Sequence, residues 1–207
     1  MPMNYKALSQ REYIASITRE PFMFHEMRVT AGLMQGGLTD EEILAAIIRD
    51  NLFQFPTEKS IKQLSRACIR RLRNLQDEGL VADIATQPVA VAKQLCLYAF
   101  MKESRLVWDF MITVIGEKYR SCNLNFNKMD LNVFFMQLQE QNDAVASWSD
   151  STIKKIKQIL ARLLVENEYL DDLKDEDLNP VILSSQLEQT IRANGDEVVF
   201  PAFNYFE

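Results

Sequence analysis

Apolar residues recur at three- and four-residue spacing along most of this chain, which is the period of an amphipathic helix. The clearest example is the run from Lys59 to Arg73, whose apolar stripe consists of Ile61, Leu64, Cys68, Leu72 and Leu75. The 207 residues include only six glycines and six prolines, too few for a sandwich or barrel rich in turns. The pattern therefore predicts an all-α, mainly helical protein.

Capping and turn residues indicate where the expected helices begin and end. The first is expected near Gln10 to Thr18, and the second from about Met23 to Met34, before the turn Gln35-Gly36-Gly37. Thr39 and Glu42 form a capping box that opens a third helix, which ends near Asn51-Leu52-Phe53. The later helices are expected at Lys59 to Arg73 with its end near Asp77-Glu78-Gly79, Ala90 to Lys102, Leu106 to Tyr119, a segment opened by Met129-Asp130, and Thr152 to Leu164 after the N-cap residues Ser149-Asp150-Ser151.

The order of elements in the first half suggests a winged helix-turn-helix. Leu80 to Ile84 is short and β-capable, so helix, turn, basic helix and short strand follow one another. Gln87-Pro88 reads as a junction, which predicts helical domains at 1–87 and 88–207. The segment from Thr152 to Leu170 repeats the helix-plus-wing pattern, as expected for an internal duplication.

Charge adds a candidate function to this outline. The chain as a whole is acidic, with a formal net charge of −6, yet Lys59 to Arg73 contains six basic residues and no acid. On a helix, most of these fall on the side opposite the apolar stripe, where they would meet a polyanion such as DNA. A second, weaker basic face lies on the helix at Thr152 to Leu164. The candidate DNA-binding residues are Lys59, Lys62, Arg66, Arg70, Arg71, Arg73, Lys154, Lys155, Lys157 and Arg162.

Other chemistry finds little support in the sequence. His25 is the only histidine, and no glycine-rich phosphate loop, zinc spacing or nucleophile motif occurs, so we expect no enzyme, metal or cofactor. Three cysteines without metal spacing and the lack of a membrane span or leader predict a cytoplasmic protein. Seven acids crowd residues 166–177, and the tail from Glu197 to Glu207 is rich in aromatic residues, which either dock on the body or await a partner.

Six short segments of the chain have the residues of one known protein family. In the first half these are Tyr5-Lys6-Ala7-Leu8, Asp50-Asn51-Leu52-Phe53 and Ile69-Arg70-Arg71-Leu72-Arg73-Asn74-Leu75. In the second half they are Gln94-Leu95-Cys96-Leu97-Tyr98-Ala99-Phe100, Trp148-Ser149-Asp150-Ser151-Thr152 and Lys154-Lys155-Ile156. Together they resemble the BrxA family, the small helical component of BREX (bacteriophage exclusion) systems. The resemblance implies a two-part helical protein, similar in fold to NusB, that binds DNA alongside other BREX proteins in phage defence. It implies no catalytic residue.

These observations favour a non-enzymatic accessory protein that binds double-stranded DNA through phosphate contacts. The competing interpretation of each basic face is an ordinary solvated helix surface. Two other functions stay open: a scaffold that docks other defence components through its tail or acidic tract, and a NusB-like RNA binder.

Overall fold

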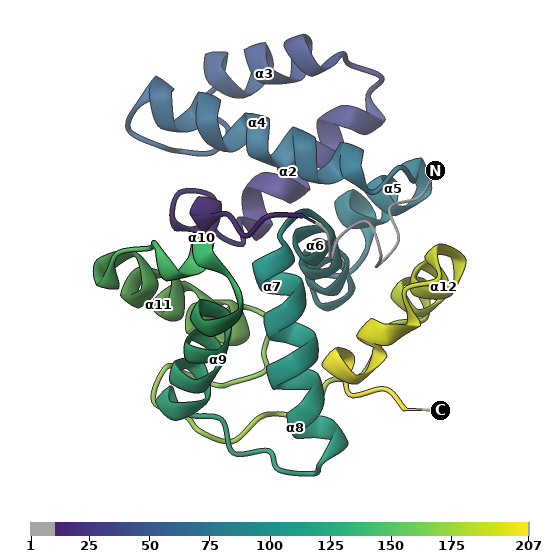
Figure 1. The fold of residues 1–207 in the computed structure, drawn as a ribbon. Coiled ribbons are helices and arrows are strands. Elements are labelled where there is room, and N and C mark those ends of the chain that lie inside the picture. The colour runs from purple at the N-terminus through teal and green to yellow at the C-terminus, as the bar shows by residue number, and fades with distance from the viewer. Residues whose placement is uncertain (1–10, 207) are drawn as a thin grey trace. The chain divides into compact units, whose positions relative to one another are not determined.

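The computed structural model describes residues 11–206, which form two units that we treat separately (Figure 1). Unit 1 comprises residues 22–103, and unit 2 comprises residues 11–21 and 104–206. Helices make up both units, and the described residues contain no strand beyond an isolated bridge between Asn125 and Asp177. The expected all-α class is confirmed. The expected boundary after residue 87 falls between two helices of unit 1.

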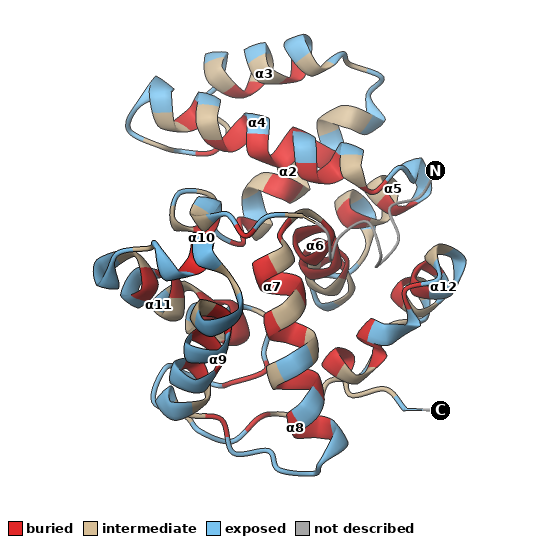
Figure 2. Cartoon of the chain, in the orientation of Figure 1, coloured by how far each residue is buried: buried red, intermediate tan, exposed pale blue. Residues whose placement is uncertain are grey.

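Unit 1 consists of α2 (Phe24–Gln35), α3 (Asp40–Arg49), α4 (Glu58–Asn74), α5 (Glu78–Thr86) and α6 (Val89–Glu103). Helix α2 packs against α4 and α5, and α6 packs against α4 and α5 as well. Thr39 and Glu42 form the predicted capping box at the start of α3. The apolar stripe of α4 is buried as predicted, from Ile61 to Leu72, and Figure 2 shows buried positions along the whole helix.

The predicted wing in unit 1 is wrong. Residues 80–84 lie inside α5, and Asp77, expected near the end of the preceding helix, accepts the Leu80 backbone N–H as the N-cap of α5. Leu80 and Ile84 are four residues apart, so both can enter the core from one face of a helix. A strand would also need a partner for its backbone hydrogen bonds, and none is present among the described residues.

Unit 2 begins with η1 (Ala15–Thr18) and continues with α7 (Arg105–Phe110), η2 (Met111–Gly116) and α8 (Glu117–Arg120). These last three form one continuous helical segment, as expected from Leu106 to Tyr119, but η2 is a π-helix. The remaining elements are α9 (Lys128–Gln141), α10 (Asp143–Ala146), α11 (Asp150–Glu166), α12 (Ser185–Asn194) and η3 (Glu197–Phe203). Residues 166–170, the counterpart of the wing, end α11 and continue as turns.

The aromatic tail docks on unit 2. Val199, Phe200 and Phe203 are buried, and η3 packs against η2 and α8. The hydroxyl of Tyr169 donates to the carbonyl of Ala202 at 2.9 Å. Of the two expectations for the tail, docking on the body is therefore the one observed for residues 197–203.

No helix in the part of the chain that the structure describes is both long enough and apolar enough to cross a lipid bilayer.

Candidate nucleic-acid interface

Helix α4 carries the larger of the two predicted basic faces. Thr57 caps its first turn by accepting the Ser60 backbone N–H, and its apolar stripe anchors one side in unit 1. Five of the six basic side chains lie on the exposed side: Lys59, Lys62, Arg66, Arg70 and Arg73. Burial of the opposite stripe fixes which way this face points, since each fully buried Leu or Ile contributes about 1.5–3 kcal/mol to stability.

Three of the exposed cations already have carboxylate partners. Lys62 pairs with Glu58 at 2.5 Å within α4, and Arg73 pairs with Asp40 of α3 at 2.8 Å. Arg70 pairs at 2.6 Å with Glu103, at the end of α6. Exposed pairs of this kind contribute only about 0–1 kcal/mol, so exchanging a carboxylate for a phosphate costs little. The partly buried Glu103 holds Arg70 more firmly than the other two are held.

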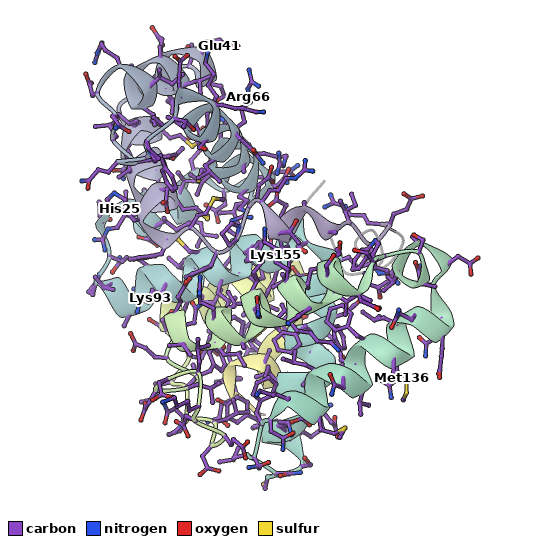
Figure 3. All side chains as sticks on the ribbon, turned by 90° about the vertical axis from the view of Figure 1, so that its left-hand side faces the viewer. His25, Glu41, Arg66, Lys93, Met136 and Lys155 are labelled. Carbon is purple, nitrogen blue, oxygen red and sulfur yellow. The ribbon has the colours of Figure 1, made fainter. Side chains whose placement is uncertain are left out.

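Lys59 and Arg66 are the freest cations on the face. Both are exposed, and neither forms a salt bridge or side-chain hydrogen bond with any residue in 11–206. In Figure 3, Arg66 extends away from the ribbon of α4. The two residues are seven positions apart, which corresponds to about 10 Å along the helix axis. Positive charge without an internal partner is therefore spread over two turns of α4.

Arg71 does not belong to this face. Its side chain is 1% exposed, its Nε donates to the carboxylate of Glu103, and its Nη1 donates to the carbonyl of Phe22 at 3.2 Å. The guanidinium also lies 4.0 Å from the ring centroid of Phe100. These contacts make Arg71 a structural residue of unit 1. The sequence carried a signal for this, because the helical period places Arg71 only about 20° from the buried Leu64.

Helix α11 carries the second basic face. Ser149 caps it by accepting the Thr152 backbone N–H, and Ile153, Ile156, Leu160, Leu163 and Leu164 form the buried stripe as predicted. Lys154, Lys155 and Arg162 are exposed and make no ion pair with any described residue. Lys155 is labelled in Figure 3. On a helical wheel these three cations fall within a sector of about 100°, so they share one face.

Lys157 differs from its neighbours on α11. Its Nζ donates to Oδ1 of Asn132 at 2.8 Å and lies 5.4 Å from the ring centroid of Phe135. Partial burial lowers the pKa of this amine. Lys157 thus helps to join α11 to α9, and it is less available to an external anion than Lys154 or Lys155.

In the acidic tract after α11, residues 166–177, two aspartate carboxylates accept hydrogen bonds from backbone N–H groups of the tract itself. Asp172 accepts the N–H groups of Lys174 and Asp175, and Asp175 accepts those of Asp171 and Asp177. Hydrogen bonds from these backbone groups lower the pKa of Asp175. Asp175 therefore stays negatively charged at neutral pH, and the acids of the tract together oppose an anion in their vicinity.

Possible metal ligands are scattered in the part of the chain that the structure describes. Among residues 11–206, no three His, Cys, Asp or Glu side chains gather as metal ligands. His25 is exposed at the start of α2 (Figure 3) and makes no hydrogen bond with a described residue. Arg73 also lines a hollow of about 810 Å³ in unit 1, but Asp77 and Glu78 line it too, so it offers no concentrated positive charge.

Sequence reasoning missed the acidic partners of the basic face. Glu103 holds both Arg70 and Arg71, and Asp40 holds Arg73, although both acids lie more than 30 positions away in the chain. No local pattern announces such pairs, because they arise only when α3, α4 and α6 pack together.

Comparisons with known proteins agree with this architecture. A crystal structure of an uncharacterized protein from Magnetospirillum magneticum resembles the chain with a TM-score of 0.78 and 26% identity, covering 93% of this chain and 98% of that one. A BREX protein BrxA of Bacillus cereus (strain H3081.97) is 32% identical over 92% of this chain and 96% of its own length. Another BREX protein BrxA, from Paramagnetospirillum magneticum (strain ATCC 700264 / AMB-1), is 27% identical over 93% of this chain and 96% of its own length.

A family model matches most of the chain as well. The BrxA model covers residues 11–195, which include every element from η1 to α12. The resemblance noted in separate sequence segments thus extends through both units. The chain belongs to the BrxA family.

Proposed function

We propose that this protein is a non-enzymatic, double-stranded DNA-binding accessory component of a BREX-type phage-defence system in the cytoplasm. Its membership of the BrxA family supports a role in BREX defence, and implies other BREX proteins as partners. The observation that carries the DNA-binding part is the exposed face of α4, where Lys59 and Arg66 have no carboxylate partner within residues 11–206.

The basic face binds phosphates rather than reading base edges in this proposal. Lys59 and Arg66 contact the DNA backbone directly, while Lys62 and Arg73 exchange Glu58 and Asp40 for phosphate oxygens. Breaking these surface ion pairs costs little free energy, because each contributes only about 0–1 kcal/mol to stability. Release of counterions from the duplex then drives the exchange. Arg71 has no part in the contact, since its guanidinium is buried.

Helix α11 assists as a second contact. Lys154, Lys155 and Arg162 offer a free cationic face in unit 2, whereas Lys157 stays bonded to Asn132. The net charge of −6 does not oppose this assignment, because the Debye length at physiological ionic strength is only about 8 Å. The local charge on each helix therefore affects phosphate binding more than the net charge of the whole chain does.

The test is fluorescence anisotropy with a labelled random-sequence duplex at several salt concentrations. The double substitution Lys59→Glu and Arg66→Glu removes the free cations of α4 while leaving its buried stripe intact. We expect salt-sensitive binding by the unmodified protein, and a large loss in the variant. Neutral substitutions at the same two positions should make the salt dependence shallower by about two units.

Arg49→Glu provides a matched control for Arg66→Glu alone, since each reverses one charge. Arg49 lies in the same unit, with a side chain 74% exposed, but outside α4. An equal loss of binding in this variant would indicate general electrostatic attraction and contradict a specific role for α4. Absence of DNA binding by the unmodified protein, even at low salt, would overturn the proposal.

A protein-interaction scaffold is the second candidate function. The observation that favours it is the exposed acidic tract, where Asp171, Asp172 and Asp177 are exposed to a basic partner. The tail offers less, because η3 is already packed in unit 2. Loss of complex assembly on neutralising these three aspartates, with DNA binding unchanged, would support the scaffold. Preference for a hairpin RNA over duplex DNA would instead favour a NusB-like RNA binder.

A further inference from the structure

Three helices of unit 1 meet at one hollow of about 810 Å³, where α2 and α4 end and α5 begins. Six of the side chains that line it are of two kinds, apolar and charged. The three apolar ones are followed here by the three charged ones: Met34, Leu72, Val81, Arg73, Asp77 and Glu78. We call this feature the α5 hollow.

The α5 hollow has an apolar floor and a charged rim. Leu72 is 1% exposed, and Met34 and Val81 are half-buried, so these side chains form its deeper part. Asp77 and Glu78 are exposed and form part of the rim. Val81 follows Asp77 by four positions and Glu78 by three, so the two carboxylates and this apolar side chain share one side of α5. An occupant therefore meets apolar surface and negative charge together.

The side chains of the α5 hollow carry a net negative charge. The guanidinium of Arg73 is paired with Asp40 at 2.8 Å, so its charge is already compensated. Asp77 and Glu78 form no ion pair with any residue in 11–206. Asp77 caps α5 by accepting the Leu80 N–H through Oδ1, which leaves Oδ2 to face the hollow's occupant. Both carboxylates are thus open to an external cation.

The helix dipoles add to this charge. Helix α2 has 12 residues and α4 has 17, and each ends at the hollow with a partial negative charge on its last carbonyl groups. The N-terminus of α5 carries the opposite partial charge, which offsets one of the two. One negative helix end remains in excess beside the two carboxylates. The α5 hollow is therefore complementary to a cation.

An arginine side chain matches both parts of the α5 hollow. Its methylene stem can lie on Leu72 and Val81 while its guanidinium reaches the carboxylates of Asp77 and Glu78. Guanidinium and carboxylate form two parallel hydrogen bonds, so arginine is favoured over lysine. The hollow is larger than one arginine side chain, which leaves room over Met34 for an apolar neighbour of that arginine.

The exposed rim also indicates which kind of molecule carries the arginine. Sites for small molecules enclose most of their ligand, whereas the rim residues of the α5 hollow are themselves exposed and would leave a small ligand largely in water. A protein that presents the arginine covers the rim with its own surface. Arginine is enriched at protein interfaces, where it often contributes much of the binding energy.

We infer that the α5 hollow is a docking site for a partner protein, which inserts an arginine flanked by apolar residues. The inference is independent of DNA binding, because the hollow would bind through carboxylates and apolar side chains and the α4 face through cations. It also concerns a different part of the chain from the acidic tract, which belongs to unit 2.

Nuclear magnetic resonance of the full chain tests this site with a defined probe, a blocked tripeptide of leucine, arginine and leucine. The chain contains six glycines, so labelling glycine alone with the heavy nitrogen isotope gives six backbone amide signals. Gly37 lines the hollow, and Gly79 follows Glu78 in the chain. Both signals should shift progressively as the peptide reaches millimolar concentration, whereas those of Gly116 and Gly195 in unit 2 should not.

Removal of the two charges tests the role of the carboxylates. Asp77→Asn with Glu78→Gln keeps the helix cap, since asparagine caps a helix as well as aspartate does. This variant should bind the peptide about tenfold more weakly, because charge-assisted hydrogen bonds are lost. Glu41→Gln with Glu58→Gln is the matched control, since these exposed carboxylates lie in the first turns of α3 and α4, away from the hollow's lining. The control should bind like the unmodified protein, and circular dichroism checks that both variants are folded.

Two further probes separate docking of a protein from other kinds of binding. A tripeptide with citrulline, an uncharged isostere of arginine, should leave the signals of Gly37 and Gly79 unchanged. Equal shifts with both peptides would overturn the inference, as would the absence of any shift with the arginine peptide. Undiminished binding by Asp77→Asn with Glu78→Gln would overturn it as well. An equal response to arginine amide alone would assign the hollow to a small organic cation and contradict docking by a protein.

Discussion

The buried guanidinium of Arg71 on α4 is paired with the carboxylate of Glu103 at the end of α6. The two residues lie 32 positions apart in the chain, and their side chains are 1% and 13% exposed. The same guanidinium bonds the carbonyl of Phe22 and stacks on Phe100. Arg71 thus joins α4 to α6 and to the segment before α2. From the buried side of α4 it fixes the position of the helix, and with it the exposed basic face.

Substitution of Arg71 by alanine should therefore destabilise the protein strongly. Removing one partner of a buried ion pair costs about 3–5 kcal/mol, and Arg70, which also pairs with Glu103, brings the expected loss toward the lower figure. Urea denaturation gives the free energy of unfolding. Arg66→Ala on the exposed side of the same helix should change it by less than about 0.5 kcal/mol. Equal effects of the two substitutions would contradict the structural role of Arg71.

Helix α11 should contribute to DNA binding through its exposed cations only. Lys155→Glu combined with Arg162→Glu should weaken binding in the anisotropy assay and make its salt dependence shallower, because two phosphate contacts are lost. Arg120→Glu, at a side chain 52% exposed in the same unit, supplies the control for Lys155→Glu alone, since each reverses one charge. If the α11 variant binds as well as this control, phosphate contact is confined to α4.

The capping box of α3 should make a pH-dependent contribution to stability. Thr39 donates to Glu42 from both its backbone N–H and its hydroxyl, at 2.8 and 2.9 Å, and these bonds lower the pKa of the Glu42 carboxyl. A lowered folded-state pKa stabilises the fold above the ordinary value near 4.5, and this benefit is lost as pH falls through the folded-state pKa. Thr39→Ala should cost about 1 kcal/mol at pH 7.

The difference in stability between Thr39→Ala and the unmodified protein should accordingly become smaller at acid pH. Thermal unfolding from pH 7 to pH 3 measures both curves. A difference that stays constant over this range would show that the Glu42 carboxylate is not part of the cap.

Gly116 should not tolerate a side chain, although it lies in a helix. A Cβ there would stand 3.2 Å from the backbone nitrogen of Ala202 and 3.2 Å from Cβ of Pro201, so η3 would have to shift. Crowding of this kind costs about 1–3 kcal/mol, which exceeds the gain of up to about 1 kcal/mol from replacing glycine in a helix. Gly116→Ala should therefore lower the free energy of unfolding measured with urea.

Gly32→Ala is the matched comparison for that experiment. Gly32 lies in α2, and a Cβ there meets no atom within 4 Å. The helix propensity of alanine then acts alone, and this substitution should stabilise the protein. Opposite signs at the two glycines would support the packing of η3 against η2, whereas stabilisation at both would contradict it.

Local signals predicted most of the helices correctly. Thr39 with Glu42, and Ser149 before α11, each mark a helix start by an N-cap bond within three residues, so sequence alone reveals them. The basic and apolar sides of α4 also follow from helical period. The failure at Leu80 to Ile84 has a physical reason. A short apolar run fits a strand or a buried helix equally well. Packing against neighbouring helices stabilises these residues as part of helix α5.

The sequence by itself determined the helical class, most helix boundaries and the two amphipathic faces, because these depend on residues within one or two turns of each other. Only the tertiary structure decided which cations are available. It buried Arg71, paired Arg70 and Arg73 with distant carboxylates and bonded Lys157 to Asn132, while leaving Lys59, Arg66 and Lys155 exposed. Whether a cationic side chain is free to contact an external anion depends on contacts between helices far apart in the chain. Those contacts exist only after the helices have packed.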